Sequence, residues 1–210
     1  PIIANIPDQN INEGSNFISF DLDSYITEQD NDITSITYTG DVDLTISING
    51  DNLVTIGIPD SDWYGSESII FTITDQTTNG FSDTDEVMFT VNNVNDSPAI
   101  AQIGNQTIEE DSILQIPISA SDVDNETLFY SAISDTTGIS LEITSTQLTI
   151  NAADFSGVAS ILVSVNDGIL AANTNFFLIV TPLDDPPTTS NMDITINEDT
   201  ILSDQLEGYD

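Results

Sequence analysis

The sequence repeats itself, and this feature limits the possible folds more than any other. A short acidic motif, INEGS at residues 11–15, recurs as IEEDS at 108–112 and as INEDT at 196–200. A second motif, DWYG at 62–65, precedes an apolar run and matches DFSG at 154–157. Self-similarity with a period of roughly 90 residues is typical of tandem structural units. We therefore predict one repeat at 1–97, a second at 98–186, and the opening of a third at 187–210, which indicates a piece of a longer chain.

Within each full repeat, short apolar runs alternate with polar residues and are separated by turns rich in Asn, Asp and Gly, such as Asn49-Gly50. The expected strands are 17–20, 33–39, 42–48, 53–58, 69–74 and 87–91 in the first repeat, and 113–119, 128–133, 139–144, 148–150, 161–165 and 176–180 in the second. With an opening strand near Ile11 or Ile108, each repeat has about seven strands, the number found in an immunoglobulin-like sandwich. The pattern predicts an all-β fold of tandem Greek-key β-sandwiches joined end to end.

The charge of the chain has one sign. The sequence contains 36 Asp and Glu and no Lys, Arg, His or Cys, which gives a net charge of −36. Without cationic side chains there is no electrostatic footprint for nucleic acid or anionic lipid, and no apolar stretch is long enough for membrane insertion. Clustered carboxylates repel one another and need counter-ions from outside the chain. Calcium, which takes six to eight oxygen ligands, is the cation that this composition favours.

Candidate calcium ligands are the acids that recur at matched places in loops, linkers and strand ends, because a sandwich brings these places together at its two ends. An opening acid, a mid-repeat Asp, an Asp-x-Asp, an Asp after a late strand and an acidic linker all recur. The predicted ligands are Glu13, Asp30, Asp32, Asp62, Asp75, Asn95, Asp96, Glu110, Asp122, Asp124, Asp154, Asp167, Asp184, Asp185 and Asp210. Isolated acids such as Asp8, Glu67 and Glu142 are interpreted as solvated surface carboxylates.

These motifs resemble the cadherin-like repeats, of about 95 residues, of large bacterial surface adhesins. The resemblance rests on the opening acid, the Asp-x-Asp, the late Asp and the Asn-Asp-x-Pro linker at 95–98. It implies cadherin-like sandwiches whose acids ligate calcium between adjacent repeats, in an extracellular or cell-surface protein. Two departures, Asp62-Trp63-Tyr64 in place of Asp-Arg-Glu and a shortened linker, imply one or two ions per junction rather than three.

The sequence favours a calcium-rigidified stalk segment of an adhesin or surface filament, whose partners are adjacent repeats of the same chain or head-to-tail copies. An enzyme is disfavoured, because the acids repeat with the fold unit, whereas an active site is a single cluster in a pocket. Two alternatives stay open. One is a carbohydrate- or surface-binding module, in which Trp63 or Tyr64 stacks on a sugar of a cell-surface glycan. The other is a fibre subunit that exchanges strands, with residues 187–210 as the donor.

Overall fold

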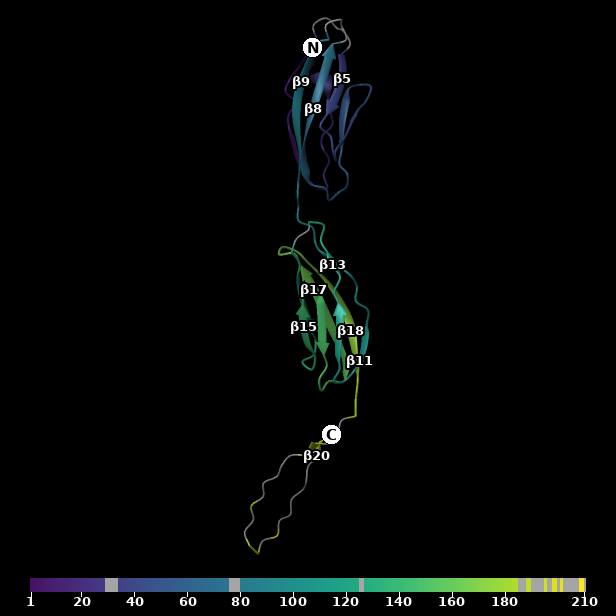
Figure 1. Ribbon diagram of the computed structural model, residues 1–210, viewed down its shortest axis with the longest axis vertical. Coiled ribbons are helices and arrows are strands. Elements are labelled where there is room, and N and C mark those ends of the chain that lie inside the picture. Colours follow the sequence, from purple (N-terminus) through teal and green to yellow (C-terminus); the bar gives the residue numbers. More distant parts are fainter. Residues whose placement is uncertain are drawn as a thin grey trace. The chain divides into compact units, whose positions relative to one another are not determined.

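The computed structural model describes residues 1–28, 34–75, 80–124 and 127–184, together with 188–189, 195, 198–199, 201 and 208–209. It divides into two compact units, Pro1–Asp96 and Ser97–Asp210 (Figure 1). Each unit is described on its own below. In the part predicted to open a third repeat, Thr188–Thr189 (β19) pairs with Gly208–Tyr209 (β20).

The first unit is a β-sandwich. A four-stranded sheet has the order β2-β9-β8-β5, a three-stranded sheet has the order β3-β7-β6, and β1 pairs with β4. The strands are Ile2–Ile3 (β1), Gln9–Asn12 (β2), Phe20–Asp21 (β3), Ile26–Thr27 (β4), Thr34–Thr39 (β5), Thr45–Ile48 (β6), Leu53–Gly57 (β7), Gly65–Asp75 (β8) and Ser82–Asn92 (β9), with a 3-10 turn at Leu22–Ser24. Strand β2 runs parallel to β9, and the other pairs are antiparallel.

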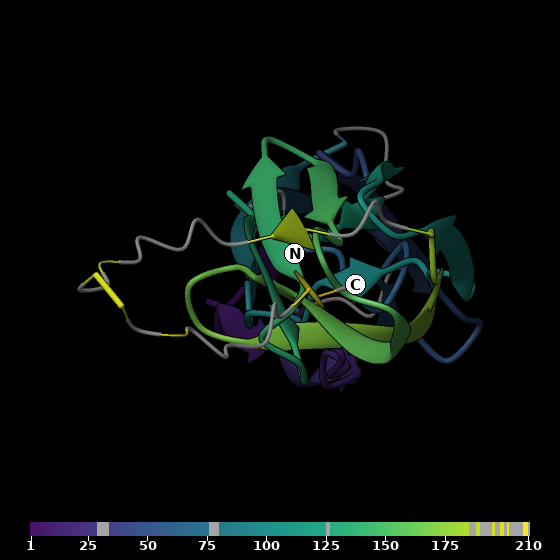
Figure 2. The ribbon, with the colours of Figure 1, turned by 90° about the horizontal axis from the view of Figure 1, so that it is seen from below.

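The second unit repeats this topology. Its sheets have the orders β11-β18-β17-β14 and β12-β16-β15, β10 pairs with β13, and β11 runs parallel to β18. The strands are Ala99–Ile100 (β10), Gln106–Glu109 (β11), Ile113–Pro117 (β12), Ala120–Ser121 (β13), Phe129–Ser134 (β14), Ser140–Thr144 (β15), Gln147–Asn151 (β16), Gly157–Asn166 (β17) and Ala171–Thr181 (β18). Figure 2 shows the same ribbon turned by 90° and seen from below. No α-helix occurs in the described part of the chain.

Each unit has its own core, formed by the inward side chains of both sheets. Strand β8 shows why, since Ile69, Phe71 and Ile73 are fully buried and alternate with more exposed neighbours. This period of two places one face of the strand in the core. Phe89 on β9 packs edge-to-face against Phe17, with ring centroids 5.2 Å apart. In the second unit Ile161 takes the place of Ile69 and is likewise fully buried.

Two aromatic residues at matched positions of the repeats lie at the edges of these cores. Trp63 packs half-buried against the first core, and Phe155 does the same in the second. A Cβ on Gly65 would lie 2.9 Å from the Trp63 ring, and one on Gly138 would lie 2.6 Å from the Phe155 ring. Both glycines therefore make room for a ring that closes the sandwich.

The fold class and the all-β assignment are confirmed, but several strand ends differ from the prediction. The long strands β8 and β9 extend beyond the predicted apolar runs at both ends, because polar residues continue the ladder past the core. The predicted strand at 42–48 begins only at Thr45, and the predicted strand at 17–20 is paired only from Phe20. The two-residue strands β1 and β10 were not predicted, because two residues show no alternation.

Among the described residues, no helix is long and apolar enough to cross a membrane.

Candidate metal centre

The opening acid of each repeat is held by the same local geometry. Glu13 and Glu110 directly follow β2 and β11, and each is followed by a residue with a left-handed backbone, Gly14 (φ 72°) and Asp111 (φ 60°). Asp199, after Glu198 of the third motif, also has a positive φ of 67°. Glycine and aspartate are among the residues that tolerate this conformation. The turn ends the strand and places the glutamate beside the segment through which the chain exits the unit.

Glu13 is anchored to that exit segment by both its backbone and its side chain. Its N–H donates to the Asn92 carbonyl at 3.0 Å, and the N–H of Val94 donates to Glu13 Oε1. Glu110 repeats the arrangement: its N–H donates to the Thr181 carbonyl at 2.9 Å, and the N–H of Leu183 donates to its Oε2 at 3.2 Å. One oxygen of each opening glutamate therefore holds the linker that follows.

The second oxygen of Glu13 has a different environment. Glu13 Oε2 is buried and has no hydrogen-bond partner in the described part of the chain. Glu13 and Asp96, which lies at the end of the same unit, have carboxylate oxygens within 4.8 Å of each other. Two oxygens that each lie about 2.3–2.6 Å from a calcium ion are at most roughly 5 Å apart. The Glu13–Asp96 pair thus has a spacing at which both carboxylates could hold one ion.

The linker that carries Asp96 is ordered by side-chain amides. The Asn92 amide donates to Asn10 Oδ1, to the Ile11 carbonyl at 2.9 Å and to Asn12 Oδ1 at 3.2 Å, which ties the end of β9 to β2. The Asn95 amide donates to the Asp96 carbonyl at 2.7 Å. Amide and carboxylate groups therefore replace the Lys and Arg contacts that this chain does not have.

In the second unit, the Asp-x-Asp motif forms a compact turn after β13. Asp122 Oδ1 accepts the N–H of Asp124 at 2.9 Å, while Asp122 Oδ2 is buried without a hydrogen-bond partner among the described residues. Both residues are half-buried. A buried carboxylate oxygen that accepts nothing is unfavourable unless a cation compensates its charge. This chain contains no side chain that could supply one.

The late aspartates Asp75 and Asp167 occupy equivalent places at the end of β8 and just after β17, and both are 7% exposed. Asp167 Oδ1 accepts the N–H groups of Ile169 and Leu170, each at 2.6 Å. These bonds form the turn into β18. The late aspartate of the second unit is therefore at least partly a turn-forming residue.

The remaining predicted ligands are less enclosed. Asp62 and Asp154 are exposed and take part in local bonds: Asp62 Oδ1 accepts the Ser61 hydroxyl at 2.7 Å, and the Asp154 N–H donates to Asp111 Oδ1 at 3.3 Å. Asp184 is exposed. Within either unit taken alone, no three described acids lie close enough to share an ion. Asp30, Asp32, Asp185 and Asp210 lie outside the described residues.

The interpretation of Glu67 as a solvated surface acid was wrong. Its side chain is 9% exposed and accepts three backbone N–H groups, from Val42 at 3.0 Å, Asp43 at 2.6 Å and Leu44 at 3.2 Å. These bonds fix the loop before β6 and explain why that strand starts late. The only signal in the sequence is that the matched position of the second repeat is apolar, Ala159.

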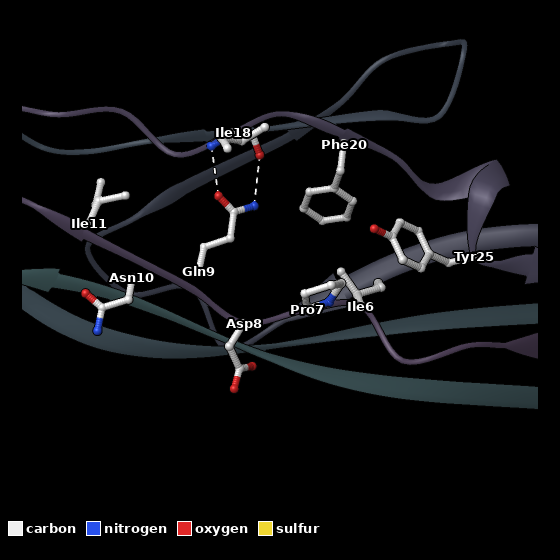
Figure 3. A pocket seen from close by; sticks show the side chains of 9 residues that line it. All are labelled: Ile6, Pro7, Asp8, Gln9, Asn10, Ile11, Ile18, Phe20 and Tyr25. Carbon is white, nitrogen blue, oxygen red and sulfur yellow. Dashed lines mark hydrogen bonds between the residues drawn. The ribbon is translucent and has the colours of Figure 1, made fainter.

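A separate hollow of about 380 Å³ lies in the first unit between β2 and residues 18–25 (Figure 3). Ile6, Phe20 and Tyr25 line its apolar part. The Gln9 side chain spans it, donating to the Ile18 carbonyl at 2.9 Å and accepting the Ile18 N–H at 2.8 Å. Gln9 thereby takes the place of a main-chain partner for the strand edge at Ile18. Neither Trp63 nor Tyr64, the residues predicted to stack on a sugar, lines this hollow.

Comparison with known proteins identifies the fold. Residues 95–179 match the family model described as Bacterial Ig domain. The chain is similar to protocadherin gamma C5 EC1-3, with 17% identity and a TM-score of 0.52 over 85% of this chain and 67% of that one. It is also similar to the protocadherin gammaB7 EC3-6 cis-dimer, with 18% identity and a TM-score of 0.51 over 94% of this chain and 52% of that one.

The fold is that of tandem cadherin-like, Ig-like sandwiches. The chain spans about half the length of the gammaB7 fragment, and at these identities the likeness concerns the fold alone. No curated protein sequence matches the chain. The resemblance to cadherin-like repeats is confirmed at the level of the fold, while membership of a large bacterial adhesin stays a prediction.

Proposed function

We propose that this chain is a non-catalytic spacer of an extracellular or cell-surface adhesin or filament, and that calcium stiffens the connection between its repeats. The observation that carries the proposal is the pair of buried carboxylate oxygens, Glu13 Oε2 and Asp122 Oδ2, that accept no hydrogen bond within the described residues. Because no Lys, Arg or His exists in the sequence, a cation from solution would compensate their charge.

Calcium fits this donor set better than other common metals. Every available ligand is a carboxylate, amide or backbone oxygen, and hard cations such as calcium prefer oxygen, whereas zinc and copper sites use Cys and His. Glu13 and Asp96 would supply oxygens from the first repeat, and Asp122 and Asp124 would supply them from the second. The close pair of carboxylates in the described part of the first unit supplies too few oxygens for calcium, which takes six to eight. Carbonyls, water or the following repeat would have to complete the coordination.

The mechanical consequence follows from the linker. The segment 92–98 is short and polar, so it cannot form the large apolar interface that holds domains rigidly together, and motion between domains is the default. An ion bound by acids of successive repeats would remove the local repulsion and cross-link the repeat ends. The same chemistry would act between copies arranged head to tail.

A comparison of three buffers tests the proposal on the intact chain: chelator, chelator with high sodium chloride, and about 10 mM calcium. At roughly 100 times its dissociation constant, calcium stabilises by about 2.7 kcal/mol per site. We expect calcium to raise both the melting temperature and the maximum particle dimension measured by small-angle scattering. Sodium chloride should reproduce only part of this, because screening coordinates nothing. Equal values in the last two buffers would reject site binding.

Carbohydrate binding remains a second candidate with narrower support. Tyr64 is 43% exposed, which leaves a ring accessible to a sugar, but its neighbour Trp63 packs against the core. Binding on a glycan array in calcium that is abolished by Tyr64→Ala would favour this function over that of a spacer.

A further inference from the structure

One stretch of backbone in the first unit is bonded to a side chain where the second unit has a strand pair. In the second unit β12 pairs with β16 along all five of its residues. In the first unit β3 pairs with β7 over two residues only, so the backbone just before β3 lies outside this ladder. There the Gln9 amide donates to the Ile18 carbonyl at 2.9 Å and accepts the Ile18 N–H at 2.8 Å.

The Gln9 amide imitates one residue of a neighbouring strand. At a hydrogen-bonded position of an antiparallel pair, a residue exchanges both N–H···O bonds with the residue opposite. A side-chain amide carries the same kinds of donor and acceptor as a peptide group, and Gln9 uses one of each on Ile18. Both bonds are exposed to solvent, so an extended peptide antiparallel to residues 16–20 can replace them when the Gln9 side chain turns away. The matched Gln106 has another role, because its amide donates to the Gly104 carbonyl at 2.9 Å.

The hollow that Gln9 spans offers a place for the side chains of such a peptide. Its volume of about 380 Å³ lies within the range of ligand sites, and Ile6, Phe20 and Tyr25 line it (Figure 3). A peptide residue opposite Ile18 would share the face of the Ile18 side chain, which is 75% exposed. Its two neighbours would point to the other face, on which Phe17 is buried. The peptide therefore needs apolar side chains on one face only.

The charge around the hollow selects the partner. Asp8 belongs to its lining, Asp21 and Asp23 lie beside it in the turn after Phe20, and all three are exposed. The chain has no Lys, Arg or His, so a second copy, with its own net charge of −36, is repelled. A segment that carries Lys or Arg is attracted instead.

We propose that the first unit binds an extended, cationic peptide segment of another protein. The segment adds as an antiparallel strand at Ile18, takes over the two hydrogen bonds of Gln9 and places an apolar side chain in the hollow. This site is separate from the calcium junction proposed above, because none of its residues belongs to the predicted ligand set.

Fluorescence anisotropy of labelled peptides, titrated with the intact chain at low sodium chloride, tests the proposal. The probe is a peptide of alternating Thr and Val with Lys at both ends, KTVTVTK, and ETVTVTE is its matched control. We expect saturable binding of the first peptide and binding of the second that is weaker by about tenfold or more. High sodium chloride should weaken binding of the first peptide, because it screens the attraction.

Three variants separate strand addition from general attraction between charges. Ile18→Pro removes the N–H that the peptide has to bind and should weaken binding by about tenfold. Gln9→Ala removes the competing amide and should tighten binding by about threefold or more. Gln106→Ala, the matched change in the second unit, should have no effect. All three positions are at least partly exposed, and unaltered melting curves would verify that the variants fold.

Four outcomes would overturn the proposal. The first is the absence of saturable binding of KTVTVTK, and the second is equal binding of the two peptides. The third is weaker binding by Gln9→Ala, which would show that Gln9 holds the ligand and is not displaced by it. The fourth is tighter binding of a peptide with the acidic sequence of residues 192–200, which would indicate strand exchange between copies of this chain.

Discussion

The two units have the same topology but differ in where their acidic residues lie and in which backbone groups these residues bind. In the first unit Asp83 and Asp85 on β9 accept backbone N–H groups from the opening segment, from Ile3 at 3.0 Å and Ile6 at 2.8 Å. The matched positions of β18 are not acidic; they are Ala172 and Thr174. In contrast, an opening glutamate occurs in both units, and in each unit one of its carboxylate oxygens accepts a backbone N–H from the linker that follows.

This difference separates two uses of a carboxylate. An acid found in one unit only, and bonded to that unit's own backbone, stabilises a local loop or strand. We interpret an acid found in both units at the edge of the linker as one that acts at the junction between repeats. Because the two units are internal references for each other, the acids of this chain can be sorted without any other sequence.

The largest expected effect in such a comparison comes from Glu67→Ala. The change leaves three N–H groups, of Val42, Asp43 and Leu44, without an acceptor, and an unsatisfied buried donor costs about 1–3 kcal/mol. We expect the first unit to lose about 3 kcal/mol or more, which lowers its melting temperature by on the order of 15 °C. Glu67→Gln keeps part of the acceptor set and should cost less.

Hydrogen exchange resolved by residue would show whether this loss is confined to the first unit. Glu142→Ala, at an exposed acid of the second unit, is the control and should change the stability by less than about 0.5 kcal/mol. Similar effects from the Glu67 and Glu142 changes would show that Glu67 is a surface acid after all.

A smaller effect is expected from Asp83→Asn and Asp85→Asn. Each change weakens one charge-assisted bond to a half-buried backbone N–H, a contribution of about 1–2 kcal/mol. Amide exchange at Ile3 and Ile6 should accelerate, while that of strand β10 in the second unit should not change. Unaltered exchange at both amides would mean that the pairing of β1 with β4 alone holds the opening strand.

The sequence predicted the sandwich, because it is encoded in local patterns that recur, whereas the assignment of the recurring acids as calcium ligands stays a prediction. Alternating runs place Ile69, Phe71 and Ile73 in the core without knowledge of any partner strand. The sequence did not predict the burial of Glu67. This burial depends on a loop 25 positions earlier in the chain, whose backbone N–H groups donate to the Glu67 carboxylate. The spacing between Glu13 and Asp96 could not be predicted either, because it depends on the parallel pairing of β2 with β9, which brings the two ends of the unit together.

The most direct test of the central claim is a calcium titration of the decalcified chain by isothermal calorimetry, with three variants beside it. Glu13→Gln removes the charge but keeps an oxygen for the Val94 N–H, and Asp122→Asn keeps one for Asp124. Glu142→Gln is the control. We predict saturable binding with a dissociation constant of roughly 10⁻⁴–10⁻³ M, as in extracellular calcium modules. Both site variants should bind at least tenfold more weakly with each sandwich still folded, and the control should bind as the parent does. A folded parent chain that gives no saturable heat with calcium, or equal binding by all four proteins, would contradict the account.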